Sequence, residues 1–180
     1  MDEYKKATIR TVAVFVGMFL FFTAADHATT LKALSMGYVE LNEKTDFSSM
    51  YSLVMPEVMG MLIGCVSIGA GLMLGRGLLA SHTLSSDEFR RIFMSGKNVL
   101  CASLVLLPLV VAAGRFFVVV NNLGLIAFGW GFMELPQRLI AEALDASPKL
   151  VDVAANSIVM VLLMKPMTRL VWYMTYSTRR

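Results

Sequence analysis

The chain has 180 residues, of which 57% are hydrophobic and only 16% are charged, and its formal net charge at pH 7 is +3. This composition excludes an ordinary soluble domain, and the basic balance does not indicate nucleic-acid binding, because the basic residues stand at the edges of long apolar runs. We therefore expect an all-α membrane protein with about four transmembrane helices, forming a single polytopic domain over residues 1–180 in a lipid bilayer.

The first two predicted spans are separated by an acidic connector. The first covers about residues 8–36, and Gly37 follows it as the residue that ends the helix. The second covers about residues 52–79. Within it, Pro56 and Glu57 are typical of a helix start, because proline fits the first turn and glutamate complements the positive end of the helix dipole.

Small residues recur along the second span at spacings of three and four, which places them on one face of the helix. These residues, which we call the glycine face, are Gly60, Gly64, Ser67, Gly71 and Gly75. A face of small side chains lets another helix approach closely, because helix association in lipid depends on packing. The approaching helix can belong to the same chain or to another subunit.

The second half of the chain is predicted to hold two more spans. Ser85 and Glu88 form a capping box that would begin a helix before the third apolar segment, about residues 99–132. That segment would make about 51 Å of helix, so it must tilt strongly, break, or leave part of itself at an interface. A mixed stretch then predicts an interfacial amphipathic helix, and the last span covers about residues 151–173, with a kink at Pro166.

Lysine and arginine residues are distributed unevenly over the connectors. They are concentrated before the first span, between the second and third spans, and after the fourth span, while the other two connectors hold few of them. Basic residues favour the cytoplasmic side of a membrane. We therefore expect four crossings, with the N- and C-termini both on the cytoplasmic side.

Polar side chains at membrane depth are the strongest functional candidates, since burying a charge in lipid costs several kcal/mol unless it is paired or hydrated. Asp26, His27 and Thr30 are predicted in the outer third of the first span, and Glu40 and Asn42 follow closely enough to fold back on them. Together they could bind a cation, hold a proton or form a structural hydrogen-bond cluster. The paired-histidine spacing of metal-binding helices is missing, so we predict no metal site.

Arg115 is the remaining candidate, in the third apolar segment. It is a predicted partner for Asp26 or Glu40, because opposite charges lower each other's burial cost when they pair. If its helix begins near Asp87, Arg115 would instead lie close to the outer rim, where it would reach the headgroups and need no partner. Arg169, near the inner rim of the last span, is expected to reach the headgroups in the same way.

Two short runs carry polar residues at fixed spacings: Asp26, Thr29 and Thr30 in the first span, and Gly37, Glu40 and Asn42 after it. In these positions the sequence resembles a family of small, uncharacterised bacterial membrane proteins, which pair an Asp-x-x-Thr-Thr run with a Gly-x-x-Glu-x-Asn-Pro run. The resemblance covers about 20 residues, and Glu43 stands where the family pattern has proline. It implies the inner (cytoplasmic) membrane of a bacterium and a shared polar cluster, with no established activity.

The sequence contains no legible catalytic signature. A phosphate-binding glycine loop, a pair of haem-binding histidines and a nucleophile with an adjacent base are all missing, so we expect neither an enzyme nor a cofactor. The leading hypothesis is a non-enzymatic membrane subunit that packs with partner proteins or with copies of itself through the glycine face. The alternative is a small ion or proton channel or transporter that uses Asp26, Glu40 and Arg115.

Overall fold

The protein is described by a computed structural model, which covers residues 3–38, 50–77, 84–145 and 147–176. Its helices, in chain order, are α1 (Glu3–Ser35), α2 (Met50–Leu74), α4 (Ser86–Phe93), α5 (Val99–Phe128), α6 (Glu134–Leu144) and α7 (Pro148–Tyr176). Four of them, α1, α2, α5 and α7, are long and apolar enough to cross a membrane. The prediction of an all-α chain with four helices of membrane-spanning length is thereby confirmed.

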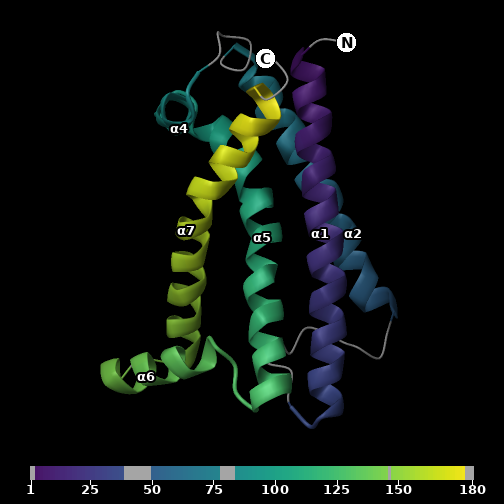
Figure 1. Cartoon of the computed structure of the whole chain (residues 1–180), viewed down its shortest axis with the longest axis vertical. Helices are drawn as coiled ribbons and strands as arrows, with labels where there is room; N and C mark the ends of the chain where they lie inside the picture. The colour runs from purple at the N-terminus through teal and green to yellow at the C-terminus, as the bar shows by residue number, and fades with distance from the viewer. Residues whose placement is uncertain (1–2, 39–49, 78–83, 146, 177–180) are drawn as a thin grey trace.

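The four long helices run along the long axis of the molecule, and α1, α2 and α5 form its packed centre (Figure 1). Both ends of the chain lie at one end of this bundle, together with α4 (Figure 1). At the opposite end α6 runs across the base of α7, between the third and fourth spans, where the sequence predicts an amphipathic helix. Its location at a membrane interface stays a prediction.

The structure resolves the two uncertain helix boundaries of the sequence. α2 begins at Met50, so Pro56 lies inside the helix, and the predicted helix start at Pro56 and Glu57 is wrong. The third apolar segment is one continuous helix that ends at Phe128, short of the predicted residue 132, because Gly129 adopts a left-handed conformation with φ 77°. These boundaries place Glu57 and the polar residues of α5 within spans.

α4 is a short amphipathic helix that closes the end of the bundle near the termini. Its predicted capping box is confirmed: the Ser85 hydroxyl accepts the Glu88 N–H at 3.3 Å, and the Glu88 carboxylate accepts the Ser85 N–H at 3.0 Å. The Ser85 hydroxyl and N–H, both donating to Glu88, hold the pKa of that carboxyl below its usual range. Phe89 and Phe93 are fully buried against the core, and Tyr176 packs edge-on against Phe89.

The glycine face of α2 is covered by helices of the same chain. A Cβ at Gly64 would overlap the Phe15 ring of α1, and one at Gly75 would lie 2.6 Å from Cys101 Sγ of α5. The Ser67 hydroxyl donates a 2.8 Å hydrogen bond to the carbonyl of Leu104. Of the two alternatives for this face, the structure has contact within the chain at Gly64, Ser67, Gly71 and Gly75, while Gly60 is exposed.

The close approach of α2 and α5 predicts a strong response to one added methyl group. A Cβ at Gly71 would lie 2.7 Å from Val105 Cγ2 and 3.0 Å from the backbone oxygen of Cys101, so Gly71→Ala forces the two helices apart. We expect a loss of about 1–3 kcal/mol in the free energy of unfolding, measured by circular dichroism in mixed detergent micelles. Gly69→Ala is the matched control, since nothing lies within 4 Å of that Cβ. Equal stability of the two variants would contradict this packing.

Candidate functional site

An ion pair between two partly buried side chains joins α5 to α2. The Arg115 guanidinium donates from one nitrogen to both oxygens of the Glu57 carboxylate, at 2.9 and 2.7 Å. Both side chains are largely covered, with relative exposures of 22% and 21%. A guanidinium stays charged at any physiological pH, so this carboxylate supplies the countercharge that the buried cation requires.

Two side chains of α1 complete the surroundings of Arg115. Its second terminal nitrogen donates to the Thr23 hydroxyl at 2.8 Å, and its guanidinium carbon lies 5.0 Å from the centre of the Phe19 ring. The latter distance allows a cation–π interaction. Arg115 therefore touches all three central helices, since it lies on α5, pairs with Glu57 on α2 and contacts Thr23 and Phe19 on α1.

His27 brings a titratable group to the same carboxylate. Its Nε2 lies 3.6 Å from Glu57 Oε1, close enough for an ion pair when the imidazole is protonated. The histidine side chain is 30% exposed, so it stands at the border of the buried region. We call Thr23, His27, Glu57 and Arg115 the charged cluster.

A second group of polar side chains lies on α1 and α5, beyond the charged cluster. The Asn122 side-chain amide donates to the Thr30 hydroxyl at 2.9 Å and lies 3.3 and 3.4 Å from Thr29 Oγ1 and Asp26 Oδ1. The Thr30 hydroxyl also donates to Asp26 at 3.4 Å. We call these four residues the amide cluster. With Thr23 and Arg115 they form a row of polar contacts between α1 and α5, the polar seam, which runs toward the end of the bundle where α6 lies (Figure 1).

The depth of Arg115 follows from the length of α5. The helix has 30 residues, or about 45 Å, and Arg115 stands 16 residues past Val99, at about 24 Å. A hydrocarbon core about 30 Å thick includes that point wherever the core lies along the helix. The alternative in which Arg115 needs no partner depended on a helix that begins near Asp87, but α5 begins at Val99 and Arg115 is paired with Glu57.

The structure brings together part of the predicted site. Asp26 and Thr30 contact each other in the amide cluster. His27, the residue after Asp26, belongs with Arg115 to the charged cluster, because both lie against Glu57. The expected pairing of Arg115 with Asp26 is wrong, since Glu57 is the acidic partner of this arginine. Glu40 and Asn42 lie outside the described residues, so their contact with the Asp26 end of α1 stays a prediction.

Sequence reasoning missed Glu57, although a signal for it was present. Glu57 is the only acidic residue between Tyr51 and Leu74, and Arg115 is the only charged residue between Val99 and Phe128. Two isolated opposite charges in adjacent apolar spans favour pairing with each other, because neither has another partner within its own span. The proline before Glu57 concealed this, since it favoured a position at a helix end.

The charged cluster is a mixed group of ionisable side chains. Within the ranges that the structure describes, no three His, Cys, Asp or Glu side chains come together in a way that could hold a metal ion. The charged cluster instead combines a permanent cation with a carboxylate and an imidazole. The carboxylate and the imidazole can each change protonation state while the guanidinium cannot.

Removing Arg115 alone should destabilise the protein more than removing the whole ion pair. Arg115→Met leaves the Glu57 carboxylate without its buried countercharge, and we expect a loss of about 3 kcal/mol in unfolding free energy in mixed micelles. The double variant Arg115→Met/Glu57→Met should recover most of that loss, because two flexible apolar side chains fit a lipid-facing core.

Asn122→Ala serves as the comparison, since it removes neutral hydrogen bonds only and should cost about 1 kcal/mol. A double variant as unstable as the sum of its two single variants would contradict the pairing of Arg115 with Glu57.

Comparison with known proteins adds no family to this picture. No protein-family model matches the chain, and neither the curated proteins nor the solved structures contain a significant match.

Proposed function

We propose that this protein is a small proton or cation transporter or channel, in which the charged cluster holds the ion or proton during its passage. The observation that carries the proposal is the Arg115–Glu57 pair with His27 beside it, at a depth where every charge is costly. A structural core would be served equally well by apolar side chains at these positions. Ionisable groups within spans commonly mark ion paths and proton relays.

The chemistry of the cluster supports an exchange of protons at Glu57 and His27. When the imidazole is protonated, two cations share one carboxylate, and when it is neutral, Arg115 alone balances Glu57. Each protonation step changes the net charge of the cluster by one unit and so changes the attraction between α1 and α2. A site whose helix contacts depend on its bound protons is the minimum requirement for coupled transport.

The polar seam leads from the charged cluster in one direction only. From Thr23 to Thr30 the face of α1 turned toward α5 is polar, over about 10 Å of helix. On the other side of Thr23, Phe15 and Phe19 are buried, and their rings lie against α2 at Gly64 and Gly60. In our proposal the amide cluster forms the entry from the α6 end, and the two phenylalanines form the closed barrier that must move for passage.

The proposed orientation places the termini and α4 in the cytoplasm of a bacterial cell, with the protein in the inner membrane. Figure 1 places both ends of the chain on the same side of the bundle. Eight basic residues lie near that end, either within the helices or in the segments that adjoin α2 and α5. They are Lys5, Lys6, Arg10, Arg76, Arg90, Arg91, Lys97 and Arg169. Lysine and arginine accumulate on the cytoplasmic side, which supports this orientation.

Flux through purified protein tests the proposal. We expect the protein in liposomes to dissipate an imposed pH or cation gradient, recorded by an entrapped pH dye or ion-sensitive dye. Glu57→Gln removes the carboxylate charge, and His27→Gln removes the titratable imidazole but preserves the Arg115–Glu57 pair, so both should reduce the flux to that of protein-free liposomes.

Asp87→Asn is the matched control, because this carboxylate is 79% exposed on α4 and should leave the flux unchanged. Either no flux with the unaltered protein, or full flux with both cluster variants, would overturn the proposal.

A second candidate is the non-enzymatic membrane subunit, with α7 as its interface in place of the glycine face. The apolar window of α7 is only 6% buried within the chain, whereas that of α5 is 39% buried. Val161 and Leu162 are exposed to 70% and 67%. Lipid can cover such a surface, but so can a helix of another copy or of a partner protein.

Cross-linking distinguishes the two interfaces. In a chain with Cys65 and Cys101 replaced by alanine, Val161→Cys should capture a neighbouring chain in native membranes after mild oxidation, seen as a doubled mass on denaturing gels. Gly64→Cys should not, because Phe15 covers that position. Capture at Gly64 and none at Val161 would restore the glycine face as the interface, and capture at neither would remove the subunit hypothesis.

A further inference from the structure

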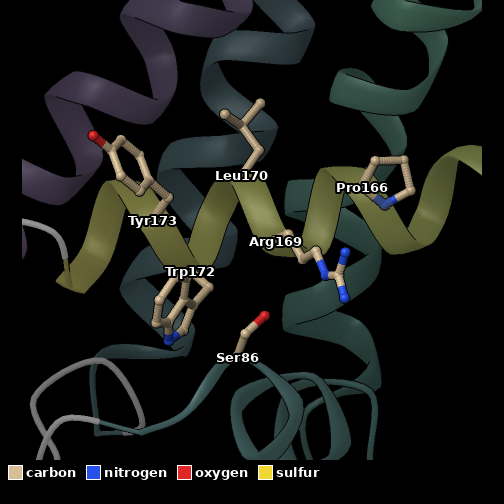
Figure 2. Close-up of a pocket in the computed structure, with 6 residues that line it drawn as sticks. All are labelled: Ser86, Pro166, Arg169, Leu170, Trp172 and Tyr173. Carbon is tan, nitrogen blue, oxygen red and sulfur yellow. The ribbon is translucent and has the colours of Figure 1, made fainter.

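A pocket lies between α4 and α7 at the end of the bundle that carries the termini (Figures 1 and 2). It has a volume of about 480 Å³. Its walls are formed by Ser86, Pro166, Arg169, Leu170, Trp172 and Tyr173. None of these residues belongs to the charged or amide cluster, so the pocket is separate from the proposed ion path.

Two polar groups in this pocket have no partner in the described part of the chain. The Ser86 hydroxyl is buried and forms no hydrogen bond. The Arg169 guanidinium forms no hydrogen bond or ion pair with any described residue. A buried hydroxyl without a hydrogen bond is costly, so a ligand that accepts hydrogen bonds from both groups would bind favourably.

The two unpartnered groups face the same space. Figure 2 shows Arg169 and Trp172 on the side of α7 that faces Ser86. A guanidinium and a hydroxyl together form the donor set that recognises phosphate oxygens. Ser86 is also the first residue of α4, where the positive end of the helix dipole favours an anion. Asp87 and Glu88 do not line the pocket, so no carboxylate competes for Arg169 there.

The apolar walls of the pocket, and its level along α7, favour a lipid as the ligand over a free anion. Pro166, Leu170 and the Trp172 ring offer hydrocarbon surface that inorganic phosphate cannot use. The Trp172 indole N–H donates to the Leu84 carbonyl at 2.8 Å, so this ring is held at the pocket wall. Arg169 lies seven residues, about 10 Å, before the end of α7 at Tyr176, and Trp172 and Tyr173 follow it within about one turn. Tryptophan and tyrosine favour the headgroup level.

We infer that the pocket binds the phosphate of an anionic phospholipid, with Arg169 and Ser86 as its donors. The glycerol and the first part of the acyl chains lie against Trp172, Leu170 and Pro166, and the rest of the chains follow the exposed apolar surface of α7. The four charged residues of α4, two acidic and two basic, cancel one another, so Arg169 supplies the local positive charge. A zwitterionic lipid carries an ammonium that would oppose this cation, which favours the anionic class.

Titration of the full-length protein tests the inference. The chain has two tryptophans, so Trp130→Phe makes Trp172 the only indole reporter. The protein in neutral detergent is titrated with dioctanoyl phosphatidylglycerol, dioctanoyl phosphatidylcholine or inorganic phosphate while Trp172 fluorescence is recorded. We expect saturable binding of phosphatidylglycerol, binding of phosphatidylcholine about tenfold weaker, and no response to phosphate at the same concentrations.

Single substitutions in this Trp130→Phe background identify the donors. Arg169→Gln should weaken phosphatidylglycerol binding by about tenfold and Ser86→Ala by about threefold, since each removes hydrogen bonds to a charged acceptor. Lys165→Gln is the matched control, because it removes a positive charge one turn earlier on α7, outside the pocket, and should leave the affinity unchanged.

Three results would overturn the inference. Equal affinity of Arg169→Gln and the background protein would remove the arginine as the phosphate donor. Equal losses for Arg169→Gln and Lys165→Gln would reduce the effect to general surface charge. Saturation by inorganic phosphate in the same concentration range as phosphatidylglycerol would show a free-anion site in place of a lipid site.

Discussion

The need to neutralise one arginine within the membrane governs the arrangement of the central helices. Arg115 cannot lose its proton, so at its depth in α5 it must find an acidic partner and further polar or aromatic contacts. It obtains them from Glu57, Thr23 and Phe19, which belong to two other helices. Because one terminal nitrogen of the guanidinium binds the Glu57 carboxylate while the other binds the Thr23 hydroxyl, the contacts of Arg115 restrict how α2 and α1 are rotated and shifted relative to α5.

That rotation also decides what the rest of α2 presents to its neighbours. At 100° per residue, Glu57, Gly64, Gly71 and Gly75 lie within about 40° of one another around the helix. The turn of α2 that directs Glu57 toward Arg115 therefore directs the glycines toward α1 and α5. The Glu57–Arg115 ion pair specifies the orientation of α2, and the small residues of the glycine face permit α1 and α5 to approach it closely. The two features therefore act together in the packing of these helices.

The sequence alone was sufficient for the broad architecture, because spans are set by length and hydropathy. Four apolar helices and the α4 capping box depend only on neighbouring residues, and both were predictable. The partner of Arg115 depended on where α2 begins, and Pro56 suggested a boundary that the helix passes through. Proline within a helix is tolerated in lipid more readily than in water, since neighbouring helices satisfy the freed backbone groups.

The end of α5 illustrates a feature that local sequence could not give. Asn121 is adjacent to Asn122 in α5, yet its side-chain oxygen accepts the backbone N–H of Met133, at 2.9 Å. That bond closes the turn after Gly129 and directs the chain toward α6. The two adjacent asparagines therefore have different roles: Asn121 stabilises a turn, and Asn122 belongs to the amide cluster. Their roles can be distinguished only from the path of the backbone after Phe128.

Arg115 and Arg169 show how depth decides which molecule neutralises a cation. Near the middle of a span neither water nor headgroups are in reach, so the chain itself must supply the partner, as Glu57 does. Near the end of a span the headgroups are available, and a protein partner would have to compete with abundant lipid phosphate. An arginine at the rim can therefore remain without a protein partner at no cost to folding, and a pocket shaped around it converts the general attraction of lipid into a specific one. In this chain side chains of two other helices neutralise Arg115, whereas Arg169 is the cation that we assign to a lipid phosphate, although the two side chains are chemically identical.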